Sequence, residues 1–211
     1  YWFIGEEHGQ PNVRRTIADT LSAFVEQNPG REILFFTEFL PQGANAQDAV
    51  AYANLGLYKG HATVWNVVHK AGIALIGLEP RFVHRNRLLQ TRYDAVPGGE
   101  SSESSIWISL EGMRLRNQSW VKLIKKYRQK HPNALFIVHC GEFHSDYLEP
   151  FAVPLSFPEE QTFVSAVYTP AAGNQFEQLL PHPFTKIPAL KWGARRYGRA
   201  TGYDLRVFVP R

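Results

Sequence analysis

The sequence predicts an α/β fold with a mostly parallel central sheet, helices on its faces, and C-terminal strands that extend the sheet. Three observations predict this fold. Short apolar runs alternate with longer segments of helical periodicity through residues 1–138, as in a parallel sheet flanked by helices. Two of these runs lead into the same pattern, Gly-Glu-x-His, at residues 5–8 and 141–144. After Pro150 prolines become frequent, and two further strand-like segments follow.

The composition is that of an ordinary globular protein. The chain has 211 residues, of which 44% are hydrophobic and 20% are charged, and this length suffices for one well-buried core. We therefore interpret residues 1–211 as a single α/β domain. Residues 1–150 would form its core, and residues 151–211 would add the C-terminal strands and an irregular extension.

Charge, cysteine content and hydropathy exclude several classes of protein. The net charge is +4 and the pI is about 9.2, with basic residues clustered at 122–130 and 186–199, but no known nucleic-acid module's interleaving of aromatic and basic residues is found. No nucleic-acid partner is therefore predicted. The single cysteine, Cys140, excludes an internal disulfide. No apolar run approaches the length of a membrane helix, so no membrane span is predicted.

The first three predicted elements are a strand, a helix and a strand. Residues 1–4 and 33–40 are apolar runs of strand length. Between them, residues 11–27 place Ile17 and Leu21 on one helical face. A proline at the start of this segment and an Asn-Pro-Gly sequence after its end mark the limits of the helix.

The next elements continue the alternation. Residues 44–57 and 61–70 are predicted to form two helices, and residues 73–78 a buried strand. A polar Gly/Ser stretch at 97–105 is predicted to be a loop. Residues 106–130 then have the periodicity of a long helix or a helix pair.

The last part of the chain is predicted to add strands to the sheet. Residues 134–138 are the fourth apolar run, and residues 162–168 and 205–209 show partial alternation of apolar and polar residues. Residues 170–201 are irregular, and no element is assigned to them.

Two histidines follow two of the predicted strands. His8 comes directly after Glu6 and Glu7, and His144 ends the second Gly-Glu-x-His pattern. Since the carboxyl ends of parallel strands meet at one edge of a sheet, both histidines should lie where open α/β sheets place their ligands. Imidazole and carboxylate groups carry out proton transfer and metal ligation near neutral pH. A polar turn is the structural alternative for His8.

A carboxylate and a guanidinium complete the candidate site. Glu38 lies inside an apolar strand, where a carboxylate is costly to bury unless it is paired. It is either a site carboxylate or half of a structural ion pair with an arginine. Glu79 ends the next strand in the same way. Arg116 could bind a carboxylate or phosphate through two parallel hydrogen bonds.

Two chemistries fit these residues. His8, Glu38 and His144 would be enough to hold a divalent metal ion with a position open for water. Without a metal, His8 would act as the base, a glutamate such as Glu6 would orient it, and Arg116 and His144 would stabilise developing negative charge. The sequence does not decide between them.

The order of these motifs resembles that of the superfamily that joins erythromycin esterases, haem-binding ChaN-like lipoproteins and TraB/Tiki metalloproteases. The resemblance spans residues 1–150. It rests on two strand-Gly-x-x-His signatures, an acidic residue in the second strand and an Arg-Asn pair, which here are Gly5 and His8, Gly141 and His144, Glu38, and Arg116 with Asn117.

The resemblance implies an α/β fold and three different activities. In the esterases the histidines and the glutamate activate water, in Tiki-like members similar positions hold a divalent metal for peptide hydrolysis, and ChaN-like members bind haem. The spacing of residues 5–8 is closer to the ChaN and Tiki form, since the esterases usually have one more residue before the histidine. The chain also lacks the additional helical subdomain of the esterases and shows no lipobox or membrane anchor.

A compact member without an anchor is similar to bacterial type III effectors that share this fold and act inside host cells. Residue 1 already belongs to a predicted strand, so we expect the chain to begin inside a longer native product, without its targeting segment. The leading hypothesis is a soluble, secreted hydrolase-like virulence effector that uses His8, Glu6, Glu38, Arg116 and His144 on a small ester, amide or peptide. One alternative is an effector recognised by a host protein partner, with a vestigial or ligand-binding site. The other is a haem-binding, ChaN-like protein.

Overall fold

The computed structural model describes residues 1–44, 46–53, 60–81, 110–168, 194–196 and 203–209. Its strands form one seven-stranded sheet with the order β3-β2-β4-β1-β5-β7-β6. The strands are β1 (Trp2–Glu6), β2 (Ile33–Pro41), β3 (Ala74–Glu79), β4 (Leu135–Gly141), β5 (Phe163–Tyr168), β6 (Ala194–Arg196) and β7 (Leu205–Phe208). All neighbours pair in parallel except β6, which lies antiparallel to β7 at the edge.

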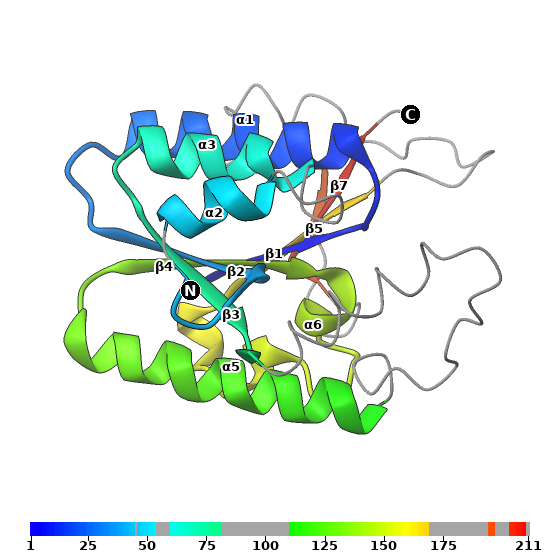
Figure 1. Cartoon of the computed structure of the whole chain (residues 1–211). Helices are drawn as coiled ribbons and strands as arrows, with labels where there is room; N and C mark the ends of the chain where they lie inside the picture. The colour runs from blue at the N-terminus through cyan, green and yellow to red at the C-terminus, as the bar shows by residue number, and fades with distance from the viewer. Residues whose placement is uncertain (45, 54–59, 82–109, 169–193, 197–202, 210–211) are drawn as a thin grey trace, which may run out of the picture.

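Helices cover both faces of this sheet (Figure 1). One face carries α1 (Pro11–Gln27), α2 (Ala46–Ala53) and α3 (Ala62–Lys70), and the other carries α5 (Leu110–Lys130). The remaining helices are short: α6 (Glu142–Ser145) and the 3-10 turns η2 (Val153–Ser156) and η3 (Glu159–Gln161). The predicted fold class, including the C-terminal strands that extend the sheet, is confirmed.

The alternation of side chains along each strand divides the core into two layers. In β1, Trp2 and Ile4 pack with the α1 and α3 residues, whereas Phe3 packs with Trp120 of α5. Successive side chains of a strand point to opposite faces, so a strand buried on both faces is apolar at nearly every position. This is why the strands show as continuous apolar runs in the sequence.

The helical faces are those expected from the periodicity. Ile17 and Leu21 of α1 are buried, as are Trp120 and Ile124 of α5. The helix predicted over residues 44–57 is described from Ala46 to Ala53, and the helix predicted over 106–130 from Leu110. The loop predicted at 97–105 lies outside the described residues, as does most of the unassigned segment 170–201, although β6 falls within it.

The fourth strand is longer than its apolar run, with His139 in the strand as expected, and a helical turn that was not predicted follows it. Strand β4 continues three residues beyond Val138 and so includes His139 and Cys140. It is followed at once by α6, a single helical turn that carries His144. Cys140 is fully buried and unoxidised, as expected for a small core residue.

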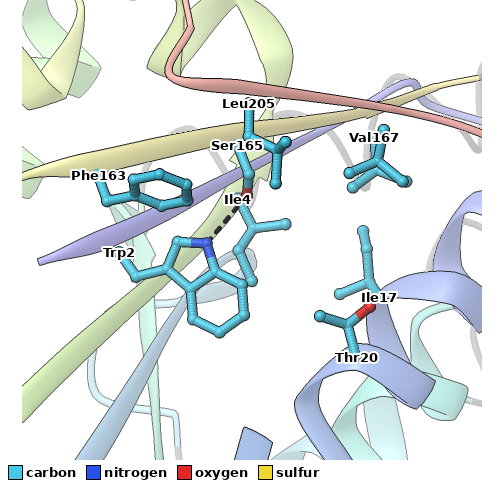
Figure 2. Close-up of a pocket in the computed structure, with 9 residues that line it drawn as sticks. Trp2, Ile4, Ile17, Thr20, Phe163, Ser165, Val167 and Leu205 are labelled. Atoms are coloured by element: carbon cyan, nitrogen blue, oxygen red, sulfur yellow. Dashed lines mark hydrogen bonds between the residues drawn. The ribbon is translucent and has the colours of Figure 1, made fainter. Parts of the chain in front are cut away.

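A small cavity lies between α1 and the sheet (Figure 2). Its volume is about 20 Å³, roughly the space of one water molecule. The Nε1–H group of Trp2 donates to Ser165 Oγ at 2.9 Å, and this hydroxyl donates to the carbonyl oxygen of Phe3. The walls are otherwise mostly aliphatic and aromatic, so this space is a packing gap and is too small for a substrate.

None of the helices among the described residues has the length and apolar character needed to span a bilayer.

Candidate functional site

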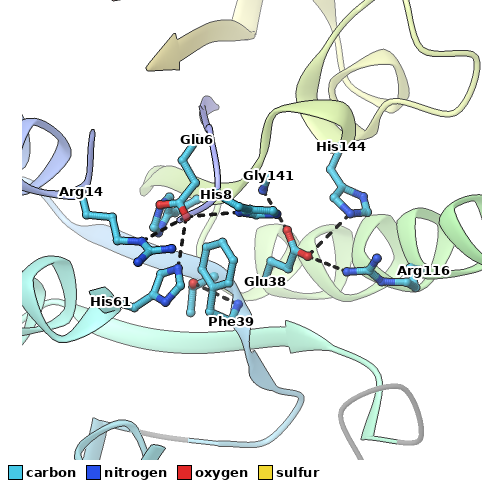
Figure 3. A network of polar contacts seen from close by, with 11 residues as sticks. Glu6, His8, Arg14, Glu38, Phe39, His61, Arg116, Gly141 and His144 are labelled. Atoms are coloured by element: carbon cyan, nitrogen blue, oxygen red, sulfur yellow. Dashed lines mark hydrogen bonds and ion pairs between the residues drawn. The ribbon is translucent and has the colours of Figure 1, made fainter. Parts of the chain in front are cut away.

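The two Gly-Glu-x-His motifs lie side by side. Strand β1 pairs in parallel with β4, and the register places Glu6 opposite Gly141. Both motifs therefore begin at the same edge of the sheet, although more than a hundred residues separate them in the chain. The expectation that both strands belong to one parallel sheet is confirmed, and this adjacency builds the site (Figure 3).

Each glycine of the two motifs permits a close approach. A Cβ atom at Gly5 would lie 2.5 Å from Ser145 Oγ and 3.0 Å from Glu142 Cα. The absence of this atom lets α6 pack against β1. A Cβ atom at Gly141 would lie 2.6 Å from His8 Nε2 and 3.4 Å from Glu38 Oε2, so the His8 ring and the Glu38 carboxylate approach the same point.

The Glu38 carboxylate occupies the centre of the site. It is 1% exposed. Its Oε2 accepts a hydrogen bond from the backbone N–H of Gly141 at 2.8 Å, and its Oε1 accepts one from Arg116 Nη2 at 2.6 Å. The ion pair with an arginine, one of the two alternatives that the sequence left open for Glu38, is therefore present, and the residue lies at the edge of the sheet.

Arg116 pairs with two carboxylates at once. From α5, its Nε and Nη2 atoms donate to the two oxygens of Glu79 at 2.9 and 2.5 Å, while Nη2 also reaches Glu38. Burial alone would lower the pKa of Arg116, but the charges of Glu38 and Glu79 outweigh it and raise that pKa. The three side chains carry a formal charge of −1 together, and Arg116 is only 3% exposed. Its guanidinium thus holds the carboxylates and does not face outward toward a substrate.

The ring of His144 is fixed in one tautomer. Its Nδ1 lies 2.5 Å from Asn117 Oδ1, and the Asn117 Nδ2 group donates to the carbonyl oxygen of Phe151 at 2.8 Å. That second bond orients the amide, so Asn117 presents an oxygen to His144 and Nδ1 must carry the proton. The other nitrogen, Nε2, lies 3.7 Å from Glu38 Oε1.

The ring of His8 is held in the same way by a carboxylate. Its Nδ1 donates to Glu6 Oε1 at 3.3 Å, which leaves Nε2 directed toward Gly141 and Glu38. The His8 side chain is 55% exposed, in contrast to the buried His144. His8 and His144 therefore both present Nε2 toward the Glu38 carboxylate, and His8 is accessible from solvent.

Glu6 contacts His8 on the side away from Glu38 and is buried. Its Oε2 accepts from His139 Nε2 at 2.8 Å, and its Oε1 accepts from His61 Nε2 at 3.2 Å and from Arg14 Nε at 3.3 Å. Burial would raise the pKa of Glu6, but the charge and hydrogen bond of His139, with the hydrogen bonds of His61 and His8, bring that pKa well below its usual value. Glu6 is thus an ionised, buried carboxylate that touches His8 but not the space around Glu38.

The candidate metal ligands do not fit a metal ion as they stand. No group of three His, Cys, Asp or Glu side chains in the described part of the chain has the arrangement of a metal site. Glu38, the carboxylate between the two histidines, already accepts hydrogen bonds on both oxygens, from Gly141 and Arg116. A metal ion bound by His8, Glu38 and His144 would have to share this carboxylate with the guanidinium of Arg116 and the N–H group of Gly141.

Of the five residues predicted for the site, four lie close together and the fifth lies beyond His8. His8, Glu38, Arg116 and His144 converge, whereas Glu6 contacts the group only through His8. The prediction did not include His61, which precedes α3 and belongs to no motif. The sequence indicated Glu79 as a carboxylate at the end of a strand and Asn117 as part of the Arg-Asn pair. It did not indicate which residues these two would contact.

Gly141→Ala tests this geometry directly. The backbone of Gly141 has φ −61°, which alanine adopts freely, so we expect an unchanged melting temperature. The new methyl group would push away the His8 ring, which is partly exposed and can swing outward. Displacing a reacting group by an ångström lowers rates by about 100-fold, and we expect a loss of that order in any hydrolytic activity of the protein. Wild-type activity in this variant would show that His8 does not work from its position beside Gly141.

Comparison with known proteins supports the fold and leaves the activity open. No protein-family model and no curated protein matches the sequence. Among solved structures, the type III effector HopBA1 superposes with a TM-score of 0.59 at 11% identity, over 99% of this chain and 87% of that one. The haem-binding protein ChaN of Campylobacter jejuni gives a TM-score of 0.47 at 10% identity, over 100% and 87%. The toxin effector domain RRSP from Vibrio vulnificus gives 0.46 at 15% identity, over 79% of this chain and 32% of that one.

At 11% identity the likeness to HopBA1 establishes a shared fold. The expected fold resemblance to a type III effector is supported to that extent. It does not assign chemistry to this chain, because one fold can carry many unrelated activities.

Proposed function

We propose that the protein is a hydrolase that acts on a small ester, amide or peptide without a metal ion, with His8 and His144 as an acid–base pair on either side of Glu38. One observation supports this most: both rings have their Nδ1–H group tied to a fixed acceptor, Glu6 or Asn117, and so present Nε2 to the same carboxylate. A pair of nitrogens fixed in this way can take a proton from one group and give a proton to another.

Charge assigns the two roles. The group of Glu38, Glu79 and Arg116 carries a formal charge of −1, and a buried net charge is costly unless it is compensated. An imidazolium at His144, whose Nε2 lies 3.7 Å from Glu38 Oε1, supplies this compensation. His144 is therefore the acid, and the exposed, neutral His8 is the base.

The reaction then balances in protons and bonds. His8 Nε2 removes a proton from a water molecule as the water oxygen bonds to the carbonyl carbon of the substrate. His144 Nε2–H gives its proton to the leaving oxygen or nitrogen as the bond from that atom to the carbonyl carbon breaks. His8 has gained the proton that His144 lost, and transfer of that proton through water from His8 Nε2 to His144 Nε2 restores the starting state. Glu38 holds the imidazolium, and Arg116 fixes Glu38.

The test uses a panel of nitrophenyl esters and peptide anilides with His8→Ala, His144→Ala and a control. His69→Ala is the matched control, because His69 is exposed in the last turn of α3. Removing a positioned acid or base lowers rates by at least about 100-fold, so we expect this loss in both site variants and none in the control. The melting temperature should be unchanged in His8→Ala and the control and lower in His144→Ala, whose ring is buried. Hydrolysis that persists in both site variants, or a wild type inactive on the whole panel, contradicts the proposal.

A second candidate function is that of an effector whose output is recognition by a host protein. It is favoured by the fold shared with HopBA1, a type III effector, over nearly the whole chain. On this hypothesis the double variant His8→Ala/His144→Ala would cause the same response in host cells as the wild type. Loss of the response in that variant would instead connect the response to the site.

A further inference from the structure

We propose that His61 and His139 are positioning residues for His8, which they serve by holding Glu6 as an ionised acceptor for the His8 ring. This proposal rests on the function proposed above and concerns how its base is prepared. It assigns a role to two buried histidines, neither of which reaches Glu38, and it places Glu6 behind the reacting atoms.

The first argument is that each of these histidines has one polar partner. The Nε2 atoms of His61 and His139 bond to Glu6 at 3.2 and 2.8 Å. The Nδ1 atoms of both rings are buried and, among the described residues, have no hydrogen-bond partner. Because the Glu6 carboxylate accepts a hydrogen bond from Nε2 of each ring, each ring must carry a proton at that nitrogen. The only described polar contact of each ring is therefore the one to Glu6.

The second argument is that stability alone would not favour histidine at these positions. A buried nitrogen without a partner destabilises a fold by about 1–3 kcal/mol, and an apolar side chain of similar shape avoids this loss. The surroundings are suited to such a side chain: His61 stacks on Phe39 with 3.7 Å between ring centroids, and Phe39 also contacts His139. The hydrogen bonds that the two imidazole groups donate to Glu6 thus explain why histidine occupies these positions.

The third argument concerns charge. Hydrogen bonds from the two rings stabilise the ionised form of Glu6, and the bond from His61 does so without adding a positive charge. Burial lowers the pKa of His61 to about 4, with Glu6 opposing the shift, so His61 is neutral at pH 7. Arg14, at 3.3 Å, is the one formal cation among the described partners of Glu6. The negative charge of Glu6 therefore remains available to orient His8 Nδ1–H and to stabilise the ring when it gains a proton.

Removing the two donors should change the tautomer of His8. Without them Arg14 is the one donor besides His8 left among the described partners of Glu6, and burial, which raises the pKa of Glu6, is opposed by fewer hydrogen bonds, so the protonated form becomes more favourable. A carboxylic acid donates where a carboxylate accepts. The Nδ1 atom of His8 would then accept, and its proton would move to Nε2, where an unrestrained imidazole prefers it. The Nε2 atom could no longer act as a base.

The experiment reads this tautomer by ¹⁵N NMR of the imidazole groups and needs no substrate. In the wild type we expect His8 to be mainly Nδ1–H at neutral pH. In His61→Leu/His139→Leu we expect it to be mainly Nε2–H, with about a tenfold or greater loss of any hydrolysis as the base is lost. His61→Gln/His139→Gln is the matched control, because glutamine can place an N–H donor near the former Nε2 position, and it should restore the wild-type tautomer.

The outcomes separate this proposal from the proposed function. An unchanged His8 tautomer in the leucine variant overturns the positioning role, whether or not the protein hydrolyses an ester. A tautomer that changes equally in the glutamine variant also overturns it, since packing rather than hydrogen bonding would then be the cause. If the double leucine variant does not fold, the single variants His61→Leu and His61→Gln give the same comparison. We then expect a partial change of the His8 tautomer in His61→Leu and no change in His61→Gln.

Discussion

Arg116→Met should be the most destabilising of the substitutions considered, with an expected loss of about 3–5 kcal/mol in the free energy of unfolding. Methionine fills much of the space of the arginine side chain but leaves Glu38 and Glu79 as two buried carboxylates without the guanidinium that pairs with both. Both are only 1% exposed, so water cannot replace the guanidinium. Urea denaturation at pH 7, monitored by tryptophan fluorescence, measures the loss.

A matched variant separates charge from packing. In Arg116→Met/Glu38→Gln/Glu79→Gln the two carboxylates become neutral amides of nearly the same shape, and most of the lost stability should return. Acid should also narrow the difference between Arg116→Met and the wild type, because protonation removes the unpaired charges. If Arg116→Met unfolds within about 1 kcal/mol of the wild type, the ion-pair group contributes little and its central place in the site would be wrong.

The second large effect is a loss of stability in acid that depends on His61. Burial lowers the pKa of this ring from 6.5 in its ordinary state to about 4 in the fold. Between these two values the unfolded chain binds a proton that the folded protein does not, so stability falls as the pH falls. The shift corresponds to about 3 kcal/mol, lost between pH 7 and pH 4. Glu6, whose pKa is lowered in the fold, extends the decline below pH 4.5, because its stabilisation is present above the unfolded pKa and is lost in acid.

His61→Gln should flatten this part of the stability curve. Glutamine keeps a donor for Glu6 but does not titrate, so the variant should lose about 3 kcal/mol less than the wild type between pH 7 and pH 4. The measurement is the urea midpoint at half-unit steps of pH. Parallel curves for His61→Gln and the wild type would show that His61 is not a buried neutral group.

Much of the fold could be predicted because its signals are local. An apolar run buried on both faces, such as residues 33–40, is a parallel-strand pattern wherever it occurs. The carboxyl ends of the strands were less certain, because β4 continues through His139, a polar residue that follows its apolar run. Its burial depends on Glu6, which comes from the other end of the chain.

The sequence predicted which residues gather at the candidate site better than it predicted the contacts between them. The rule that parallel strands end at one edge was enough to gather His8, Glu38 and His144. It could not reveal that Arg116 bridges Glu38 and Glu79, because that contact depends on the α5 helix lying across the ends of β2 and β3. His61 was missed because a lone histidine before a helix carries no local sign of its partner.

The sequence by itself determined the order of strands and helices, the burial of the sheet on both faces, and the edge at which the polar residues meet. These follow from periodicity and chain direction, which act over a few residues at a time. The tertiary structure alone decided that β1 lies beside β4, that Glu6 is buried among histidines while Glu38 meets an arginine, and that Asn117 sets the tautomer of His144. Hydrogen bonds act over about 3 Å between residues that the fold brings together, and no local pattern in the chain encodes such a pairing.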